Sequence, residues 1–157
     1  VAAFTGMRIE EVAQLRTVDV DETKFTIPVG KTPDAARKVP VHPKLRPLVR
    51  RLLAEAEGSE WLFPTLKENK HGERSGRMVQ KFGTLKKSLG HPPELVFHSI
   101  RKCAIGQLHD QGVPEQHAAP VLGHKIRTLS YGLYSSGPRL ETLAEVIGHL
   151  RYEGLEP

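Results

Sequence analysis

The strongest constraint on the fold is a change in hydrophobic spacing, because apolar residues alternate with polar ones over only one short stretch of chain. Three alternating runs occur there: Val18 and Val20, then Phe25, Ile27 and Val29, then Val39 and Val41. Alternation places every second side chain on one face of a strand. The turn-forming sequence 30–36 separates the last two runs, and Pro28 favours an edge strand. These runs predict a small three-stranded antiparallel sheet.

The rest of the chain has helical spacing, with apolar residues recurring at intervals of three and four. We expect helices at 5–16, 43–56, 75–89, 97–111 and 139–150, and shorter helical segments starting at Pro114 and covering 130–134. Thr5 is the expected N-cap of the first helix. Pro120 is expected to interrupt the helix that starts at Pro114. The expected fold class is therefore α+β and mainly helical.

The apolar spacing also predicts which side chains of three expected helices face the core or a partner. Helix 75–89 should bury Met78, Phe82, Leu85 and Leu89. Helix 97–111 should bury Cys103 together with its apolar neighbours. Helix 139–150 is amphipathic, and its apolar face makes it a candidate for contact with a neighbouring copy of the chain.

Composition limits the classes of protein to which the chain can belong. Its 157 residues suffice for one domain, 1–157, with a buried core. The sequence contains no run of 18 apolar residues, so we expect no membrane-spanning helix. Cys103 is the single cysteine, which excludes an internal disulfide and favours a reducing, cytoplasmic location. The net charge of +5 is compatible with nucleic-acid binding.

Two groups of charged residues could bind an anion. Arg8 lies in the first turn of its expected helix, where the helix dipole disfavours a cation, and Glu11 can offset its charge. His98 and Arg101 are three residues apart at a helix start and so share one face. A helix N-terminus with arginine and histidine suits a phosphate. Taken singly, each group also fits an ordinary solvated surface.

A third group combines a turn with two tyrosines. Gly123 in Leu122–Gly123–His124 lets the backbone turn and brings the histidine to a tip. Tyr131 and Tyr134 follow within about ten residues. A lone histidine or tyrosine is more often a packing residue, so this group also gains meaning only from the others.

The ordered set of motifs is more specific than its parts. Along the chain it consists of Thr-Gly-Met-Arg-Ile-Glu-Glu (5–11), Gly-Lys-Thr (30–32), His-Ser-Ile-Arg (98–101), Leu-Gly-His (122–124) and Tyr134. In this order the chain resembles the catalytic domain of the tyrosine recombinases of the phage integrase family, from about Phe4 to Tyr134 and on into the last helix. The resemblance implies a site-specific recombinase or integrase that cleaves and rejoins DNA through a 3′-phosphotyrosyl intermediate. Relatives carry an N-terminal core-binding domain, and the apolar start Val1–Phe4 suggests a fragment that lacks it and the beginning of its first helix.

The resemblance assigns three residues to the non-bridging oxygens of the scissile phosphate and a fourth to the orientation of one of them. Arg8, Arg101 and His124 match the residues that bind its non-bridging oxygens, where charge spreads during phosphoryl transfer. Glu11 matches an acidic residue that orients Arg8. Guanidinium groups then take the place of a metal ion as the charge sink, so the resemblance implies no metal and no cofactor. The spacing of the eight histidines also lacks a metal-binding pattern.

The resemblance also assigns proton transfer and the nucleophile. His98 matches a residue that contacts the phosphate and accepts the tyrosine proton, and Lys31 matches the general acid for the departing 5′ oxygen. Lys38, on the same hairpin, is the rival acid. Tyr134 matches the nucleophile, because it lies ten residues after His124, whereas the rival Tyr131 lies seven after it.

The expected partners are double-stranded DNA and further copies of the chain, which would form a tetramer on DNA through the C-terminal helix. No membrane partner is expected. The nearest alternative is a type IB topoisomerase-like enzyme, which shares the chemistry without strand exchange. A non-catalytic DNA-binding module of the same fold and a helical protein-interaction domain are the alternatives from other classes. Formation of a covalent DNA adduct separates the enzymes from both.

Overall fold

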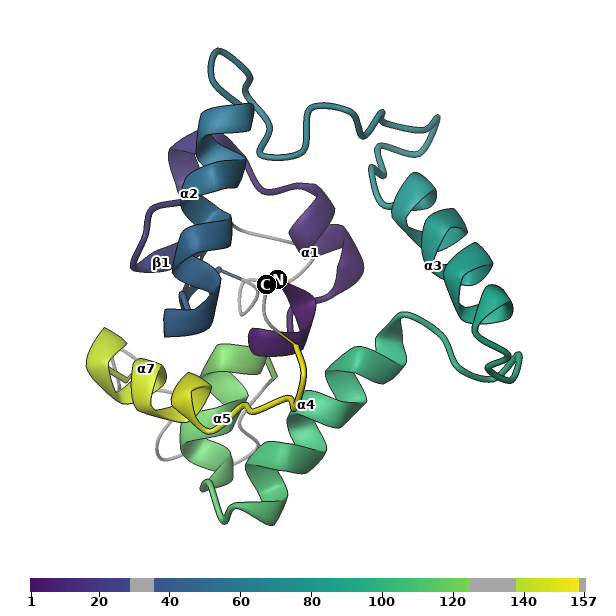
Figure 1. The fold of residues 1–157 in the computed structure, drawn as a ribbon. Coiled ribbons are helices and arrows are strands. Elements are labelled where there is room, and N and C mark those ends of the chain that lie inside the picture. The colour runs from purple at the N-terminus through teal and green to yellow at the C-terminus, as the bar shows by residue number, and fades with distance from the viewer. Residues whose placement is uncertain (29–35, 125–137, 156–157) are drawn as a thin grey trace.

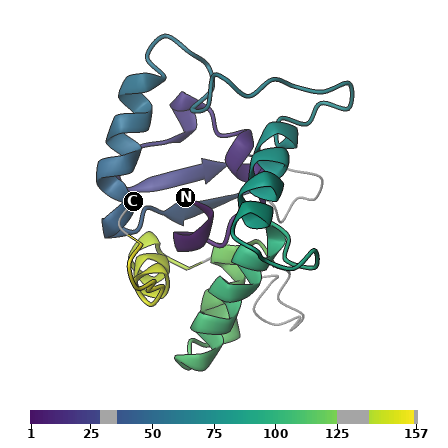
Figure 2. The ribbon, with the colours of Figure 1, turned by 45° about the vertical axis from the view of Figure 1, so that its right-hand side comes forward.

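Helices surround a two-stranded antiparallel sheet in the computed structural model, which describes residues 1–28, 36–124 and 138–155 (Figure 1). Strand β1 (Lys24–Ile27) pairs with β2 (Arg37–Pro40), with Phe25 opposite Val39 and Ile27 opposite Arg37. The three apolar side chains of these pairs are buried. Figure 2 shows the two strands between α2 and the end of the molecule that carries α3. One face of the sheet is thus part of the hydrophobic core.

The expectation of three strands is wrong in the described part of the chain. Val18 lies in the 3-10 helix η2 (Thr17–Asp19) and is 81% exposed, and Val20 makes only an isolated bridge to Phe25. Local polar contacts explain this. Arg16 Nε donates to Asp19 Oδ2 at 2.7 Å across the 3-10 turn. Asp21 Oδ1 then accepts from the backbone N–H groups of the next turn, which competes with strand pairing.

The four long helices expected from periodicity are confirmed to within a few residues at each end. They are α2 (Arg46–Glu55), preceded by the 3-10 helix η4 (Pro43–Leu45), α3 (Gly76–Ser88), α4 (His98–Asp110) and α7 (Leu140–Gly148). Pro47 lies in the first turn of α2, where its missing N–H costs nothing. None of the described helices is long and apolar enough to span a membrane. The segment 130–134, expected to be helical, lies outside the described residues.

The first helix is shorter than expected, and Thr5 is not its N-cap. Thr5 instead ends the 3-10 helix η1 (Ala2–Phe4), and its hydroxyl accepts from the N–H of Met7 at 3.2 Å. Gly6 follows with φ +63°, which no helix continues through. Helix α1 (Ile9–Ala13) therefore begins only after a loop, with Arg8 as its N-cap. This loop carries an arginine at the point where a helix starts.

Pro120 does not interrupt α5 (Glu115–Leu122), contrary to expectation. A proline within a helix removes one N–H group, here the one that would bond to Gln116. The helix continues for two more residues and ends at Gly123, whose φ is +66°. The backbone N–H groups of Gly123 and His124 both donate to the carbonyl of Ala119, which closes the end. This closure turns the chain sharply at the Leu-Gly-His motif.

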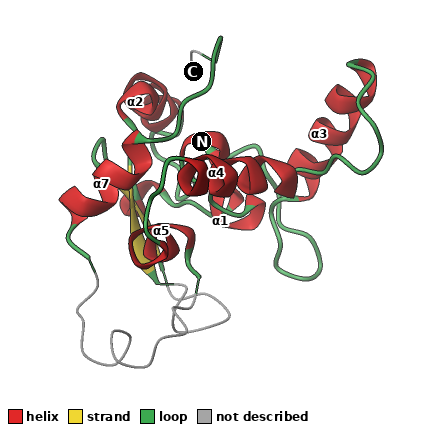
Figure 3. Cartoon of the chain, turned by 90° about the horizontal axis from the view of Figure 1, so that it is seen from below, coloured by secondary structure: helices red, strands yellow, loops and turns green. Residues whose placement is uncertain are grey.

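Helix α3 stands apart from the rest of the fold, on the side opposite α7 (Figures 1 and 3). None of its residues is fully buried, and Leu85 and Leu89, which we expected to be inward, are 57% and 63% exposed. Phe82 makes an edge contact with Phe97 at 5.4 Å between ring centroids. Cys103 of α4 was also expected to be inward and is exposed. The periodicity identified these helices correctly but not how much of each is covered.

Helix α7 packs against α5 and β2 and buries Leu143, Val146 and Ile147. The segment after it returns to the start of the chain. There the hydroxyl of Tyr152 donates to the carbonyl of Ala3 at 2.9 Å, and the ring meets Phe4 edge-on at 5.2 Å. Burial raises the pKa of Tyr152 to about 12, so the hydroxyl remains a donor at neutral pH.

The buried imidazole of His42 makes the stability of the fold depend on pH. Its Nδ1 accepts from the backbone N–H of Lys44 at 3.1 Å, and its ring lies 4.6 Å from that of Phe4. Burial, and then the charge of Lys44, lower the pKa of His42. The unfolded chain therefore binds a proton more readily than the folded chain. Stability should be fully present above the unfolded histidine pKa of about 6.5 and should decrease as the pH falls below it.

We expect His42→Asn, which keeps a side-chain acceptor at this N-cap, to lose part of that pH dependence. Urea unfolding at about pH 7.5 and about pH 5.5 measures it. The free energy of unfolding should drop more between these two values in the unmodified chain than in the variant. His109→Asn is the matched control, because the His109 side chain is 88% exposed and should leave the dependence unchanged. An equal drop in all three proteins would contradict the assignment.

Candidate active site

Glu11 is the carboxylate around which two arginines gather. Its Oε1 and Oε2 accept from Arg37 Nη1 and Nη2 at 3.0 and 2.8 Å, and its Oε1 also accepts from Arg8 Nη1 at 2.9 Å. Glu11 Oε2 accepts the backbone N–H of Arg8 at 2.8 Å, which satisfies one backbone donor at the start of α1. Burial alone would raise the pKa of Glu11, but the bonds and charges of Arg37 and Arg8 outweigh it and lower the pKa. Glu11 is therefore an anion at neutral pH.

Arg101 joins two loops that are far apart in sequence. It lies in the second turn of α4 and is only 2% exposed. Its Nη1 donates to the carbonyl of Gly6 at 2.5 Å, and its Nη2 donates to the carbonyl of Leu122 at 2.6 Å. Burial first, and then the charge of Arg8, lower the pKa of Arg101 to about 10, so it is still a cation at neutral pH.

His124 contacts Arg101 directly, with Nε2 2.7 Å from Nη2. A guanidinium group can only donate, so Nε2 accepts and the ring proton lies on Nδ1. Burial, then the charges of Arg101 and Arg8, lower the pKa of His124. The histidine is thus held neutral, and its exposed ring keeps one N–H donor.

The glycine between these residues allows the close packing. Gly123 has φ +66°, and a Cβ added there would lie 2.7 Å from Arg37 Nη1. Its carbonyl lies 3.5 Å from Arg8 Nη2, and the preceding Val121 carbonyl accepts from Arg37 Nε at 2.9 Å. The guanidinium groups of Arg8 and Arg37 therefore both contact the backbone at the Leu-Gly-His turn.

The structure brings together four of the seven residues selected from the sequence: Arg8, Glu11, Arg101 and His124. His98 is the first residue of α4, one turn before Arg101, and it is exposed. The described residues offer it no hydrogen-bond partner. Lys31 and Tyr134, and the rival Tyr131, lie outside the described residues. The rival acid Lys38 is exposed on β2, opposite Thr26.

Arg37 is the member of the cluster that we did not select from the sequence. Its side chain is only 7% exposed. The signal was present in the alternation of β2, because Arg37 is two residues before Val39 and so lies on the buried face of the strand. An arginine on a buried strand face needs a carboxylate or carbonyl partner. That requirement identifies Arg37 as part of a buried charged group.

The cluster has an excess of positive charge. The guanidinium groups of Arg8, Arg37 and Arg101 face the single carboxylate of Glu11, while His124 is neutral. The Arg8 side chain is 44% exposed, so its remaining N–H groups can reach a ligand. Such an arrangement suits an anion with several oxygens, such as a phosphate. Among the described residues, no group of three or more His, Cys, Asp or Glu side chains is placed to hold a metal ion.

We expect Gly123→Ala to destabilise the fold by roughly 1–3 kcal/mol more than a conformational cost alone, because the new Cβ displaces the Arg37 guanidinium. Gly112→Ala is the matched control, since Gly112 also follows a helix, has φ +71°, and has open space around a Cβ. Urea unfolding of both variants measures the difference. Equal losses of unfolding free energy would show that the contact with Arg37 is unimportant.

Comparisons with known proteins found relatives named as integrases or recombinases. Two Sinorhizobium fredii proteins provisionally named integrase/recombinase, y4eF and y4qK, are each 27% identical to this chain, over 76% and 92% of its length. The chain spans less than half the length of either relative, 48% and 39%. The crystal structure of XerA recombinase has a similar fold, with a TM-score of 0.59 and 18% identity, covering 96% of this chain and 50% of that one.

The match to the phage integrase family extends over residues 1–134. This range contains the loop at Arg8, the β1–β2 hairpin, α4 with Arg101, and the turn at His124. It confirms the resemblance that the order of the motifs suggested. Because the match includes most of the 157 residues, the chain belongs to the phage integrase family.

Proposed function

We propose that this chain is the catalytic domain of a site-specific DNA recombinase or integrase, and that it cleaves and rejoins DNA through a phosphotyrosyl bond at Tyr134. Membership of the family and a recombinase-like fold support the general activity. The observation that carries the proposal is the contact of Arg101 with His124 at 2.7 Å, beside Arg8. These are the three residues for which a role in binding the scissile phosphate was expected.

The charge of the cluster suits the reaction. During phosphoryl transfer, negative charge spreads over the non-bridging oxygens of the phosphate, and fixed guanidinium groups stabilise that charge. Arg8 is the partly exposed cation, and His124 offers an N–H donor at the surface. Arg101 is buried and holds the loop at Gly6 and the end of α5 in place, because it donates to the carbonyls of Gly6 and Leu122. Removal of one such donor typically lowers the rate on the order of 10²–10³-fold.

Cleavage then needs two proton transfers. The Tyr134 oxygen attacks the phosphorus, and its proton passes to His98, which lies at the exposed start of α4. The bond from phosphorus to the 5′ oxygen breaks, and Lys31 donates a proton to that oxygen. The products are a 3′-phosphotyrosyl bond and a free 5′ hydroxyl. Rejoining is the reverse: a 5′ hydroxyl attacks the phosphorus and Tyr134 leaves.

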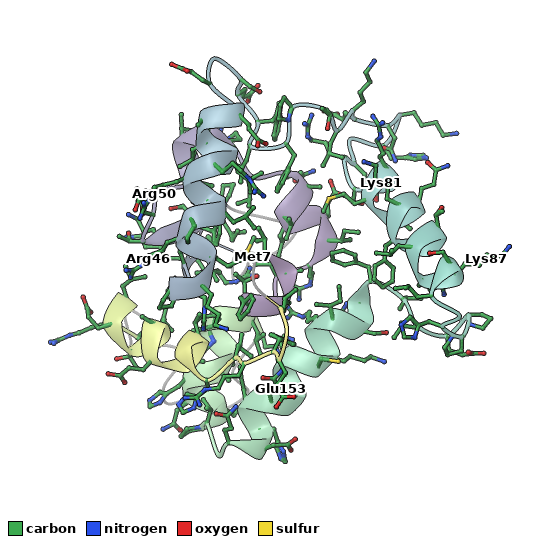
Figure 4. All side chains as sticks on the ribbon, viewed as in Figure 1. Met7, Arg46, Arg50, Lys81, Lys87 and Glu153 are labelled. Carbon is green, nitrogen blue, oxygen red and sulfur yellow. The ribbon has the colours of Figure 1, made fainter. Side chains whose placement is uncertain are left out.

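Helix α3 supplies a basic surface for the DNA backbone. Its sequence contains Arg77, Lys81, Lys86 and Lys87 and no acidic residue. Lys86 is engaged within the chain, since its Nζ donates to the carbonyls of Pro93 and Leu95 at 2.6 Å. Lys81 and Lys87 are exposed, and Lys87 extends from α3 away from the body of the molecule (Figure 4). Exposed cations of this kind bind phosphates without regard to base sequence.

Assembly into a tetramer through the C-terminal helix stays a prediction. The apolar face of α7 packs here against α5 and β2 of its own chain. Exchange between copies would therefore replace an existing intramolecular contact by an equivalent intermolecular one.

We predict that Tyr134→Phe abolishes covalent attachment to DNA and that Tyr131→Phe does not. The probe is a library of nicked duplexes with a randomised central region, in which the cleaved strand diffuses away and traps the adduct. Adducts that survive detergent are counted, and the attached peptide is identified by mass spectrometry. A nucleotide found on Tyr131 would contradict the assignment. Retarded but never covalently bound DNA would favour the non-catalytic module.

We predict that Lys31→Ala slows cleavage far more than it weakens DNA binding. A 5′-phosphorothiolate linkage at the cleavage site should restore the rate, because sulfur leaves without needing a proton. Lys38→Ala is the control on the same hairpin, since its side chain is exposed on β2. Single-turnover cleavage of both substrates measures the rescue. Rescue of Lys38→Ala instead would assign the acid to Lys38.

A further inference from the structure

We propose that Arg37 is a positioning residue for the anion site: it connects the β-hairpin to the Leu-Gly-His turn and, through Glu11, sets the orientation of Arg8. The inference rests on the proposed function, because it concerns the same site. Each of the three nitrogens of the Arg37 guanidinium group donates to an atom of the chain, and the side chain is only 7% exposed. It therefore acts through its neighbours.

The contacts of Arg37 reach helix α1 and the end of helix α5 at once. Its Nη1 and Nη2 donate to the two oxygens of Glu11 at 3.0 and 2.8 Å, a two-pronged pairing that fixes the plane of the carboxylate. Its Nε donates to the carbonyl of Val121 at 2.9 Å. A lysine has no planar fork and cannot make these three bonds in the same geometry.

The fixed carboxylate then holds Arg8. Glu11 Oε1, which Arg37 orients, is also the oxygen that pairs with Arg8 Nη1 at 2.9 Å. The Arg8 side chain is 44% exposed and would otherwise be free to adopt several rotamers. An arginine held in one orientation before the ligand arrives stabilises a transition state better than a mobile one.

Arg37 is the first residue of β2, so the pairing of the two strands fixes the position of its backbone. Arg37 pairs with Ile27 of β1, and Val39, two residues on, is fully buried. The carbonyl of Val121 and the close approach to Gly123 connect the same guanidinium group to the end of α5. The hairpin, α1 and the turn before His124 therefore share one buried side chain.

The charge of Arg37 gives a test that does not depend on cleavage. The charged groups that influence His124 are Arg101, Arg8, Arg37 and Glu115; the three arginines lower its pKa, and Glu115 raises it. Replacement of Arg37 by a neutral residue should therefore raise the pKa of His124. Arg37→Lys keeps the charge and removes the fork, so it should leave that pKa closer to its original value.

The first experiment is an NMR pH titration of the His124 ring in the unmodified chain, Arg37→Met and Arg37→Lys. The control is Arg74→Met, because Arg74 is also a buried arginine but bonds to the carbonyls of Ala13 and Phe63. We expect the His124 midpoint to rise in Arg37→Met and to stay unchanged in Arg74→Met. An unchanged midpoint in folded Arg37→Met would overturn the placement of Arg37 in the site.

The second experiment measures single-turnover formation of the DNA adduct with the most reactive nicked duplex from the library. For Arg37→Lys, we expect the rate at saturating DNA to fall about a hundredfold, the order of loss that a shift of about 1 Å in a catalytic group can cause. The DNA concentration for half-maximal rate should change little, since the buried side chain does not contact DNA. A rate at saturation equal to that of the unmodified chain would overturn the positioning role. This test uses Arg37→Lys, so it does not depend on whether Arg37→Met folds.

The two readouts separate failure of this proposal from failure of the proposed function. If the unmodified chain forms no adduct, the proposed cleavage activity is wrong, and the His124 titration alone decides whether Arg37 belongs to the cluster. If the unmodified chain forms the adduct and Arg37→Lys forms it equally fast, the activity stands and the positioning role is wrong.

Discussion

The burial of one arginine determines how the site is built. A guanidinium group out of water is tolerated only when its N–H groups are paired, and Arg101 finds its acceptors on two loops that are not neighbours in sequence. The burial of Arg101 therefore requires the carbonyls of Gly6 and Leu122 to lie close together. Gly6 has φ +63°, and a Cβ added there would lie 2.6 Å from Leu122 Cδ2, so both the backbone and the space favour glycine. The site is thus a consequence of satisfying a buried cation.

Two adjacent glutamates divide the work of helix α1. Glu11 pairs with the arginines of the anion site, whereas Glu10 accepts the backbone N–H groups of Arg74 and Ser75 at 2.8 and 3.0 Å, just before α3. The Arg74 guanidinium group also lies 4.1 Å above the ring of Trp61. One short helix therefore fixes both the arginines that surround Glu11 and the start of α3. Neighbouring residues on a helix point in different directions, which makes this division possible.

The sequence allowed most helices to be predicted because helical periodicity is local and repeats over ten or more residues. The prediction of a strand at Val18 and Val20 was wrong because these residues give only two alternating positions. The hydrogen bonds that Asp19 and Asp21 accept favour turns instead. The approach of Arg8, Arg101 and His124 was expected from the order of the motifs. Arg37 was missed because an arginine in a hairpin is usually solvated, and only the alternation with Val39 indicated otherwise. The exposure of Leu85 could not be predicted, since periodicity gives the apolar side of a helix but not what covers it.

Helix α3 is only loosely covered by the rest of the fold, although Phe82 and Lys86 also contact the segment before α4. Glu10 holds the backbone immediately before it, while the helix itself has no fully buried residue and its far end exposes Leu85 and Leu89. The tilt of such a helix can change with little repacking of the core, so under the proposed function its adjustment to a duplex would cost little free energy. Its backbone amides should then exchange with deuterium well before those of α4, whose Ala104 and Leu108 are part of the core. Local opening and DNA accommodation would in that case be two expressions of the same loose attachment.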